Sequence, residues 1–361
     1  MTTYYIESDG NGGTTGGDGS IGSPFGTLAE MDGSITLTDG DTVYIDTETN
    51  GPLLESWSKS GLTGITFENK PGTALARILN VEKHVVEIAH DIGGGDSFDT
   101  YKSAAGVLGF TPESIIEDWD ATINGDKIRK GFLKSYGTFA ELRANKGYLY
   151  SAGRLWVSVP DTETTVGRTY YAGKTGDVVT LTNPTRVTFN NISFELATES
   201  GNGNGYGLRI LGVCADVIIN DCMSDGCQYH SVGSVGTGTN GFTLNRFNFG
   251  SVKAGTDSHF VVYTSDAALQ NVVLNSPKFY ATPWLDVDGN ALEAGSVKNF
   301  ASHHLSGADP TPAGGIIINN MQSFDRGFNP THNHYDFALT ANNTNHSAPT
   351  DKDDPDTKKS A

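Results

Sequence analysis

The stretch VIIND at residues 217–221 decides the fold, because its pattern recurs five more times in the chain within segments that share little else. Each copy carries an asparagine at its fourth position, and five of the six copies have apolar residues at the first and third positions. Successive asparagines are separated by 30, 25, 30, 24 and 20 residues. They are Asn190, Asn220, Asn245, Asn275, Asn299 and Asn319. Such spacing indicates one structural unit that is stacked repeatedly, with loops of different lengths between the units.

Apolar residues at alternating positions are typical of a strand with one buried face. In the first-quoted copy, Val217 and Ile219 would face inward, and Asn220 would sit at a bend between stacked strands. An asparagine there can hydrogen-bond the asparagine one coil away and satisfy turn backbone that is otherwise buried. The copy ending at Asn299 is the weakest match, because Lys298 stands where an apolar residue belongs. The pattern therefore predicts an all-β protein with a parallel β-helix.

Composition limits the partners that the protein can have. The 361 residues include 45 glycines and only 18% charged residues, which favours many turns and short strands. A formal net charge of −18 argues against nucleic acid and against an anionic membrane surface as partners. We expect no targeting signal and no membrane-spanning segment, because no apolar run of sufficient length is found. Cys214, Cys222 and Cys227 cannot form a closed disulfide framework, which suits a chain made in a reducing cytosol. Two of them lie on or beside the Asn220 strand, where buried free thiols act as small apolar residues.

The first 80 residues carry a resemblance to a known family. The segments Tyr4-Tyr5-Ile6, Ser23-Pro24-Phe25-Gly26-Thr27-Leu28 and Gly40-Asp41-Thr42-Val43-Tyr44-Ile45 are similar to the start of right-handed parallel β-helix proteins of the pectate-lyase-like class. Proteins of this class include phage tailspikes and polysaccharide-active enzymes. The resemblance implies a right-handed, single-stranded β-helix with an N-terminal cap. It places a strand, a Gly/Asp-rich loop and a capping helix in residues 1–38, followed by the first coils in residues 39–97.

The remaining domain boundaries follow from changes of pattern. Residues 98–160 are expected to form a small insertion, because SIIEDWDATIN, DKIRKGF and FAELRANKG have the spacing and composition of short helices. The insertion would end in a hairpin around Ser151-Ala152-Gly153, which resembles an element of carbohydrate-binding and carbohydrate-cleaving β-helix proteins. The main coils would occupy residues 161–330. Residues 331–361 would form a polar tail, since they contain little apolar surface to bury.

A second set of short segments lies between the asparagine strands and is predicted to stack into a long shallow surface that suits an extended polymer. The segments are YGLRIL, CQYHSV, SHFVVY and TPWLDV. Imidazole, carboxylate and guanidinium groups would supply catalysis, and aromatic and carboxylate groups would bind sugar. The catalytic candidates are His230, His259, Asp286 and Arg209, and the substrate-binding candidates are Tyr229, Trp284 and Asp288.

Two chemistries remain open for this surface. A glycoside hydrolase needs two carboxyl groups, for which Asp225, Asp257, Asp286 and Asp288 are candidates. A polysaccharide lyase needs a base, from His230, His259 or Tyr229, and a cation, from Arg209 or Lys253. No cofactor is expected, although Asp286, Asp288 and Asn290 form a DxDGN segment that can supply oxygen ligands to Ca²⁺.

These observations favour a virion-associated spike or fibre protein of a bacteriophage that binds host surface polysaccharide, with depolymerisation left open. We expect a homotrimer that contacts other virion proteins and is assembled in the host cytoplasm. One alternative is a stand-alone, extracellular polysaccharide lyase or glycoside hydrolase. The other alternative is a non-catalytic structural protein of the virion.

Overall fold

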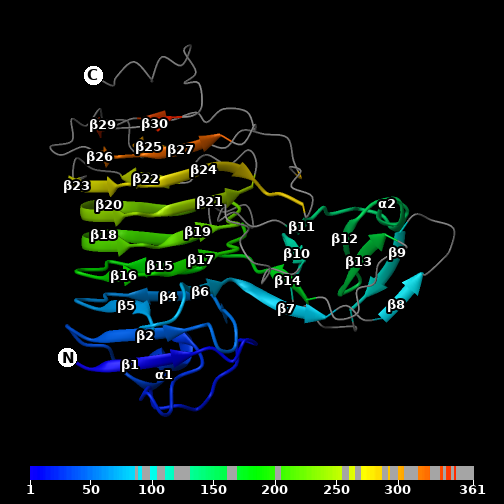
Figure 1. Cartoon of the computed structure of the whole chain (residues 1–361), viewed down its shortest axis with the longest axis horizontal. Coiled ribbons are helices and arrows are strands. Elements are labelled where there is room, and N and C mark those ends of the chain that lie inside the picture. Colours follow the sequence, from blue (N-terminus) through cyan, green and yellow to red (C-terminus); the bar gives the residue numbers. More distant parts are fainter. Residues whose placement is uncertain are drawn as a thin grey trace.

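The computed structural model describes residues 1–85, 88–91, 98–103, 110–117, 131–160, 169–199, 205–253, 260–264, 270–286, 292, 300–304, 316–325, 334–335, 339–342 and 345–346. This part of the chain consists almost entirely of β-strands. Figure 1 shows a column of stacked coils with the N-terminus at one end, and a smaller module that projects from the side of the column. The column determines where the candidate sites lie.

Two sheets form the column, and within each sheet the strands pair in parallel. The first sheet contains β1 (Thr3–Glu7), β2 (Thr42–Asp46), β4 (Trp57–Ser60), β5 (Thr66–Asn69), β15 (Val179–Thr182), β16 (Thr188–Asn190), β18 (Tyr206–Asn220), β20 (His230–Asn245), β22 (Phe260–Thr264), β23 (Gln270–Asn275), β25 (Phe300–His304), β26 (Ile316–Asn319), β28 (His334–Tyr335) and β29 (Leu339–Asn342). The second sheet contains β3 (Leu53–Leu54), β6 (Ala76–Leu79), β17 (Ile192–Glu195), β19 (Met223–Asp225), β21 (Asn248–Val252), β24 (Lys278–Pro283), β27 (Gln322–Asp325) and β30 (Asn345–His346). The chain thus folds as a parallel β-helix. The direction in which it winds stays a prediction.

The core lies between the two sheets and consists of stacked apolar side chains. Val217 and Ile219 are fully buried, as the alternating pattern predicts, and their register partners in neighbouring coils are buried with them. Aromatic rings also stack between coils: the ring centroids of Phe67 and Phe189 are 5.3 Å apart, and those of Phe249 and Phe279 are 4.3 Å apart. Side chains of the same kind therefore stack on one another in successive coils.

A ladder of side-chain amides runs along the bends. Asn220 donates from Nδ2 to Oδ1 of Asn190 at 2.8 Å, and Asn245, Asn275 and Asn319 repeat the same bond to the preceding rung at 2.8 Å. Asn190 begins the row by donating to the carboxylate of Glu68 at 3.0 Å. The ladder steps directly from Asn275 to Asn319, because β26 pairs with β23. Asn299, which was predicted as a rung, lies outside the described residues.

Each rung is followed by a sharp bend. The residues after the ladder asparagines have φ between 53° and 54°, although none of them is glycine: Asn191, Asp221, Arg246, Ser276 and Asn320. This left-handed conformation turns the chain from one sheet into the other within about one residue. L-residues pay roughly 1–2 kcal/mol for it, so the ladder bonds and the parallel pairing on both sides must hold these bends in place.

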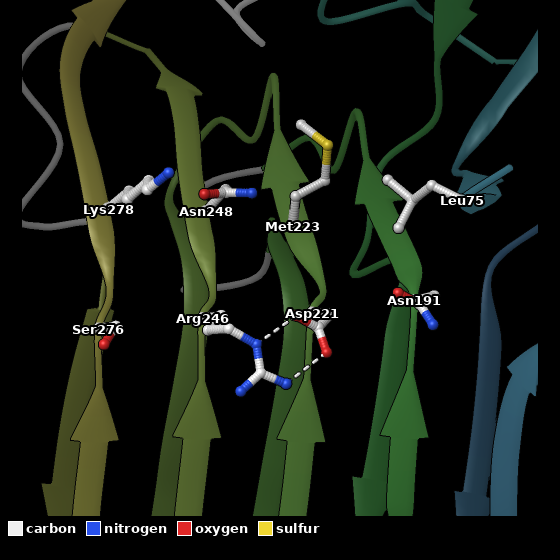
Figure 2. A pocket seen from close by; sticks show the side chains of 8 residues that line it. All are labelled: Leu75, Asn191, Asp221, Met223, Arg246, Asn248, Ser276 and Lys278. Atoms are coloured by element: carbon white, nitrogen blue, oxygen red, sulfur yellow. Dashed lines mark hydrogen bonds and ion pairs between the residues drawn. The ribbon is translucent and has the colours of Figure 1, made fainter.

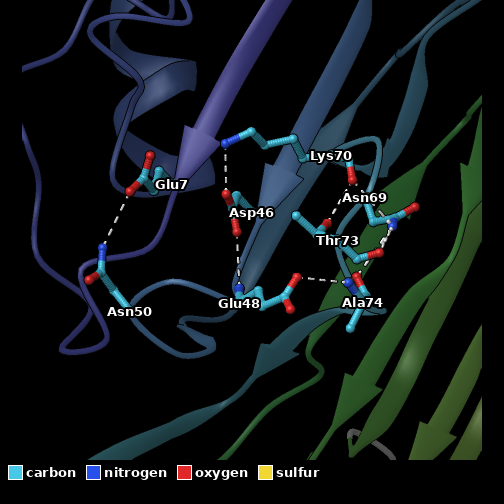
Figure 3. A network of polar contacts seen from close by, with 8 residues as sticks. All are labelled: Glu7, Asp46, Glu48, Asn50, Asn69, Lys70, Thr73 and Ala74. Carbon is cyan, nitrogen blue, oxygen red and sulfur yellow. Dashed lines mark hydrogen bonds and ion pairs between the residues drawn. The ribbon is translucent and has the colours of Figure 1, made fainter.

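The N-terminal end of the column is capped. Helix α1 (Leu28–Ser34) covers the first coils with Leu28 and Met31, and its first N–H groups donate to the carboxylate of Glu55. A network of polar contacts joins these coils beyond the ends of β2 and β5, as Figure 3 shows. Lys70 pairs with the buried Asp46 at 2.9 Å, and Glu48 accepts a hydrogen bond from the N–H of Ala74.

The inserted module is larger than predicted and consists mainly of strands. One antiparallel sheet contains β7 (Val81–Val85), β10 (Ile115–Glu117), β11 (Phe132–Leu133) and β14 (Thr169–Gly173), and the other contains β8 (Ile88–Asp91), β9 (Phe98–Lys102), β12 (Gly147–Ser151) and β13 (Arg154–Pro160). Within the described part of the module, one expected helix forms, α2 (Phe139–Ala144), where Thr138 and Glu141 make a capping box. The expected hairpin joins β12 and β13 through Ala152 and Gly153, both with positive φ, which matches a tight two-residue hairpin turn.

The prediction of helices in SIIEDWDATIN and DKIRKGF is wrong for those of their residues that the structure describes. Ile115 and Ile116 belong to β10, and Phe132 belongs to β11. Ile115 is buried within the module, whereas Ile116 and Phe132 are buried in a cluster that includes Leu79 and Leu196 of the column. Packing therefore decides their conformation rather than helical spacing. The module begins at β7 and ends at β14, so the predicted boundaries of 98 and 160 are both too narrow.

The coils also continue beyond the predicted boundary at residue 330. β28, β29 and β30 pair in parallel with β25, β26 and β27 and add a further coil. Asn342 stands opposite Asn319 in this pairing, at the next ladder position. Residues 347–361, the rest of the expected tail, lie outside the described residues.

The three cysteines are free, and all three are buried. Burial raises the pKa of each of the three thiols to about 12. Among the described residues, helices are too short and too polar to cross a membrane.

Candidate functional site

The structure confirms only part of the predicted strand stack. The first halves of β18 and β20 pair with each other, and β22 and β25 follow them, so Arg209, Gly233, Val261 and Ala301 lie in one register row. The segment TPWLDV does not join this stack, because β24 runs into it and pairs with β21 and β27 in the other sheet. The prediction that this segment stacks on the strand of Arg209 is therefore wrong. Trp284 and Asp286 are therefore not on the strand row of Arg209.

Three of the predicted site residues do lie together. The guanidinium of Arg209 lies 4.9 Å from the ring centroid of Tyr206, and the rings of Tyr229 and His230 are 4.0 Å apart. Arg209 also pairs with Asp177 at 3.4 Å, and Asp177 accepts the N–H groups of residues 205 and 206. Burial raises the pKa of Tyr206. These contacts hold the beginning of β18 in place.

Burial hinders proton transfer by two of the predicted catalytic candidates, His230 and Asp225. His230 is 0% exposed, and so is Asp225, whose Oδ1 accepts both the N–H and the hydroxyl of Ser251. A general acid or base must reach the substrate directly or through one water. His259, Asp257, Asp288 and Asn290 lie outside the described residues, so their predicted roles stay predictions.

Asp286 is partly exposed, whereas Trp284 is 6% exposed and stacks on Phe132 of the module with ring centroids 4.4 Å apart. No group of three or more His, Cys, Asp or Glu side chains in the described part of the chain is arranged to hold a metal ion. The calcium site at Asp286, Asp288 and Asn290 stays a prediction.

A groove follows the bends on the outside of the column, with a volume of ≈ 690 Å³. We call it the corner groove. Figure 2 shows its two rows of side chains, one from the left-handed residues directly after the rungs and one from the strands of the second sheet. The first row is Asn191, Asp221, Arg246 and Ser276, and the second is Leu75, Met223, Asn248 and Lys278. The first row advances by one residue per coil, whereas the second passes over the coil of β17 between Leu75, which directly precedes β6, and Met223.

An ion pair stands at the centre of the corner groove. Arg246 donates from Nε to Oδ1 of Asp221 at 2.5 Å and from a terminal nitrogen to Oδ2 at 2.6 Å. The hydrogen bonds from Arg246 lower the pKa of Asp221 and raise that of Arg246. Both side chains remain accessible, at 41% and 61% exposure. The groove therefore offers a carboxylate, a guanidinium, an ammonium, amides and a hydroxyl on one open surface.

The sequence contained a signal for this groove that the repeat pattern did not use. The residue after each rung varies in type, which argues against a role in the core, and polar residues at a bend are exposed by default. The aligned repeats thus mark one column of exposed polar side chains, at the position directly after the asparagine.

No protein-family model matches the sequence, and no curated protein matches it. Among solved structures, the chain is similar to a complex of XylC with xylose, at 11% identity and a TM-score of 0.42, covering 96% of this chain and 72% of that one. It is also similar to a GH136 lacto-N-biosidase from Eubacterium ramulus, at 10% identity and a TM-score of 0.33, covering 95% of this chain and 55% of that one. A third similar structure is a glycoside hydrolase, at 7% identity and a TM-score of 0.28, covering 95% of this chain and 96% of that one. Likenesses this distant do not assign a site.

Proposed function

We propose that this protein binds an extended polysaccharide along the corner groove. The observation that carries this proposal is the repetition of polar side chains over four successive coils, from Asn191 through Asp221 and Arg246 to Ser276. With a strand separation of roughly 4.8 Å, these coils span about 14 Å along the column. A surface that is long, shallow and periodic suits a polymer better than a compact cofactor.

The chemistry of the lining supports a sugar ligand. Hydroxyl groups of a sugar both donate and accept, and the groove provides acceptors at Asp221 and donors at Arg246 and Lys278. Bonds to charged groups are stronger than bonds between neutral partners. Leu75 and Met223 add apolar contact at one end of the groove, against which the C–H face of a sugar ring can pack.

Binding without cleavage is the function that this groove supports. A glycoside hydrolase uses two carboxyl groups, one of which must be protonated. Asp221 is the single carboxyl group among the described residues that line the groove, and Arg246 lowers its pKa, which opposes a role as general acid.

We further propose that the protein acts in the spike or fibre of a bacteriophage, as a homotrimer that contacts other virion proteins and recognises host surface polysaccharide. The three buried free thiols suit a chain that folds in a reducing cytoplasm before release. The exposed apolar side chains of Val213 and Ile218, at 55% and 38%, project from β18 and offer surface for neighbouring subunits. Analytical ultracentrifugation tests this assembly, with a mass of three 38.3 kDa chains as the expected result.

The test of polysaccharide binding uses a panel of bacterial surface polysaccharides and compares Arg246→Ala with Arg186→Ala. Both arginines have φ of 53° and form exposed ion pairs, Arg246 with Asp221 and Arg186 with Asp39. Only Arg246 lines the corner groove. We expect one polymer of the panel to bind, with about tenfold loss of affinity for Arg246→Ala, a change of about 1.4 kcal/mol, and little loss for Arg186→Ala.

Reducing ends and unsaturated products are measured in the same samples. We expect neither to appear. Release of products would contradict binding without cleavage and favour a hydrolase or a lyase. Equal affinity of the two arginine variants would remove the corner groove from the proposal, and a panel without any binding would favour a structural virion protein.

A further inference from the structure

We infer that a second pocket, between the inserted module and the coils, binds a single sugar residue that carries a carboxylate. This pocket, which we call the module pocket, has a volume of ≈ 380 Å³. It is lined by residues 111–114, 133–135 and 148 of the module and by Lys253, Trp284 and Leu292 of the column. The inference does not depend on the corner groove, which is formed by other residues.

Two buried polar groups of the module pocket lack partners within the described part of the chain. The indole Nε1–H of Trp284 has no hydrogen-bond acceptor, and the hydroxyl of Ser114 has no hydrogen-bond partner. The two residues are only 6% and 3% exposed. A buried polar group without a partner costs about 1–3 kcal/mol, and such groups in a native protein usually have an explanation. A ligand that accepts a hydrogen bond from the indole of Trp284 and forms another with the hydroxyl of Ser114 would explain both groups.

The indole of Trp284 is held rigidly. Its ring stacks on that of Phe132 with an interplanar angle of 9°, and its backbone carbonyl accepts the N–H of Leu292 at 3.0 Å. The neighbouring carbonyl of Leu285 accepts the N–H groups of Gly131 and Phe132 from the module. The aromatic wall is therefore part of the junction between module and column and is formed before any ligand arrives.

The charge of the pocket selects an anion. Lys134 and Lys253 line it together with Glu113, so the described lining has more positive than negative charge, in a protein whose formal net charge is −18. The ammonium of Lys253 lies 5.8 Å from the ring centroid of Trp284. A carboxylate that bonds to Lys253 would hence bring the attached ring against the indole. The combination of an aromatic wall, a cation and unpaired hydrogen-bonding groups fits a ring with an apolar face, hydroxyl groups and one carboxylate.

The test compares sugars that differ only at carbon 6. Glucuronic and galacturonic acid are titrated into the full chain and followed by saturation-transfer NMR and calorimetry, with glucose and galactose as the neutral counterparts. We expect the acids to bind at least about tenfold more tightly than the neutral sugars, since bonds to charged groups contribute about 1.5–3 kcal/mol.

Three variants locate the binding. Lys253→Met removes the cation of the module pocket, whereas Lys278→Met removes a cation of the corner groove and serves as the matched control. Trp284→Phe keeps an aromatic ring that can stack on Phe132 but removes the Nε1–H donor. We expect Lys253→Met and Trp284→Phe to weaken acid binding about tenfold or more and Lys278→Met to leave it unchanged. Circular dichroism verifies that each variant is folded.

Three results would overturn the inference: equal binding of acids and neutral sugars, equal effects of the two lysine variants, or no binding of either acid. Polymer binding at the corner groove is read separately through Arg246→Ala, so failure of one proposal is distinguishable from failure of the other.

Discussion

Asn245 shows what a single ladder residue contributes. Its Nδ2 donates to Asn220 and its Oδ1 accepts from Asn275, so one side chain joins three coils. Replacing it with alanine removes both bonds and leaves each partner one bond short in a partly buried place. We expect Asn245→Ala to lower the free energy of unfolding by about 1–3 kcal/mol, measured by urea denaturation. Asn248→Ala, three positions later on the groove surface, serves as the control and should cost much less.

Glu55 gives the stability of the cap a dependence on pH. Burial raises the pKa of its carboxyl to about 7, although hydrogen bonds from the N–H groups of Leu28 and Ala29 oppose the rise. Between the ordinary value of 4.5 and about 7, the folded state holds a proton that the unfolded state releases. The stability due to this group is therefore present below about pH 4.5 and is lost as the pH rises to about 7.

We expect the wild type to lose on the order of 3 kcal/mol more than Glu55→Gln between about pH 4.5 and pH 8, in urea denaturation at each pH. The glutamine cannot ionise and should lack this part of the dependence. Parallel curves for the two proteins would contradict the assignment. The lowered pKa of Asp221, caused by Arg246, acts in the opposite direction and at lower pH, where protonation of this carboxylate removes stability.

At the bends, the stacking of the coils holds non-glycine residues in a left-handed conformation that these residues disfavour. Ser276 has φ of 53° in a run where the neighbouring strands are extended. Glycine adopts this conformation freely but loses more entropy on folding, so the two terms of about 1–2 and 0.5–1 kcal/mol partly cancel. We expect Ser276→Gly to raise the free energy of unfolding by about 0.5–1 kcal/mol. Thr243→Gly, in an extended position of β20, should lower it, and a loss in both variants would refute the strain at the bend.

The repeating strands were predictable because their side chains repeat. Val217, Ile219 and Asn220 each have partners of the same kind one coil away, so a pattern with period two and a fixed final residue determines both strand and register. β10 and β11 were not predictable in this way. With three and two residues, these strands are too short to show a repeated alternation, so the sheet that they join decides their conformation.

The candidate site also has one part that the sequence predicted and one part that it did not. The proximity of Arg209, Tyr229 and His230 follows from the pairing of β18 with β20, which the spacing indicated. The module pocket does not follow from spacing, because Trp284 meets Phe132 only through a module whose size the sequence understated. Alignment of the repeats would have revealed the polar position that lines the corner groove. No residue type recurs at that position in all coils, so the repeat pattern did not mark it.

At the scale of the whole molecule, the module can be separated from the column. It leaves and re-enters the column at Val81 and Gly173, which stand opposite each other in the pairing of β7 with β14. Opposed residues of an antiparallel pair are about 4.5–5.5 Å apart, so a two-residue Asn-Gly turn can replace residues 82–172. We expect the shortened chain to keep the strands of the column and its polymer binding.

Excision should also abolish binding of the acidic monosaccharide, because one wall of the module pocket is removed. Circular dichroism and the two binding assays test these outcomes together. Excision exposes the apolar surface around Leu196 and Trp284, which is buried in the intact protein. A lower unfolding temperature is the expected consequence. Retained acid binding without the module would contradict the location of the pocket.

The amide ladder has a direction along the column. In each of its four amide–amide bonds, the Nδ2 of one rung donates to the Oδ1 of the rung before it, so the amide dipoles add head to tail from Asn319 back to Asn190. The positive end of this row meets the carboxylate of Glu68, much as an acidic residue meets the N-terminus of a helix. Each added rung polarises its neighbours. The column thus has an electrical polarity with a fixed counter-charge at one end, and its coils are not interchangeable even where their sequences match.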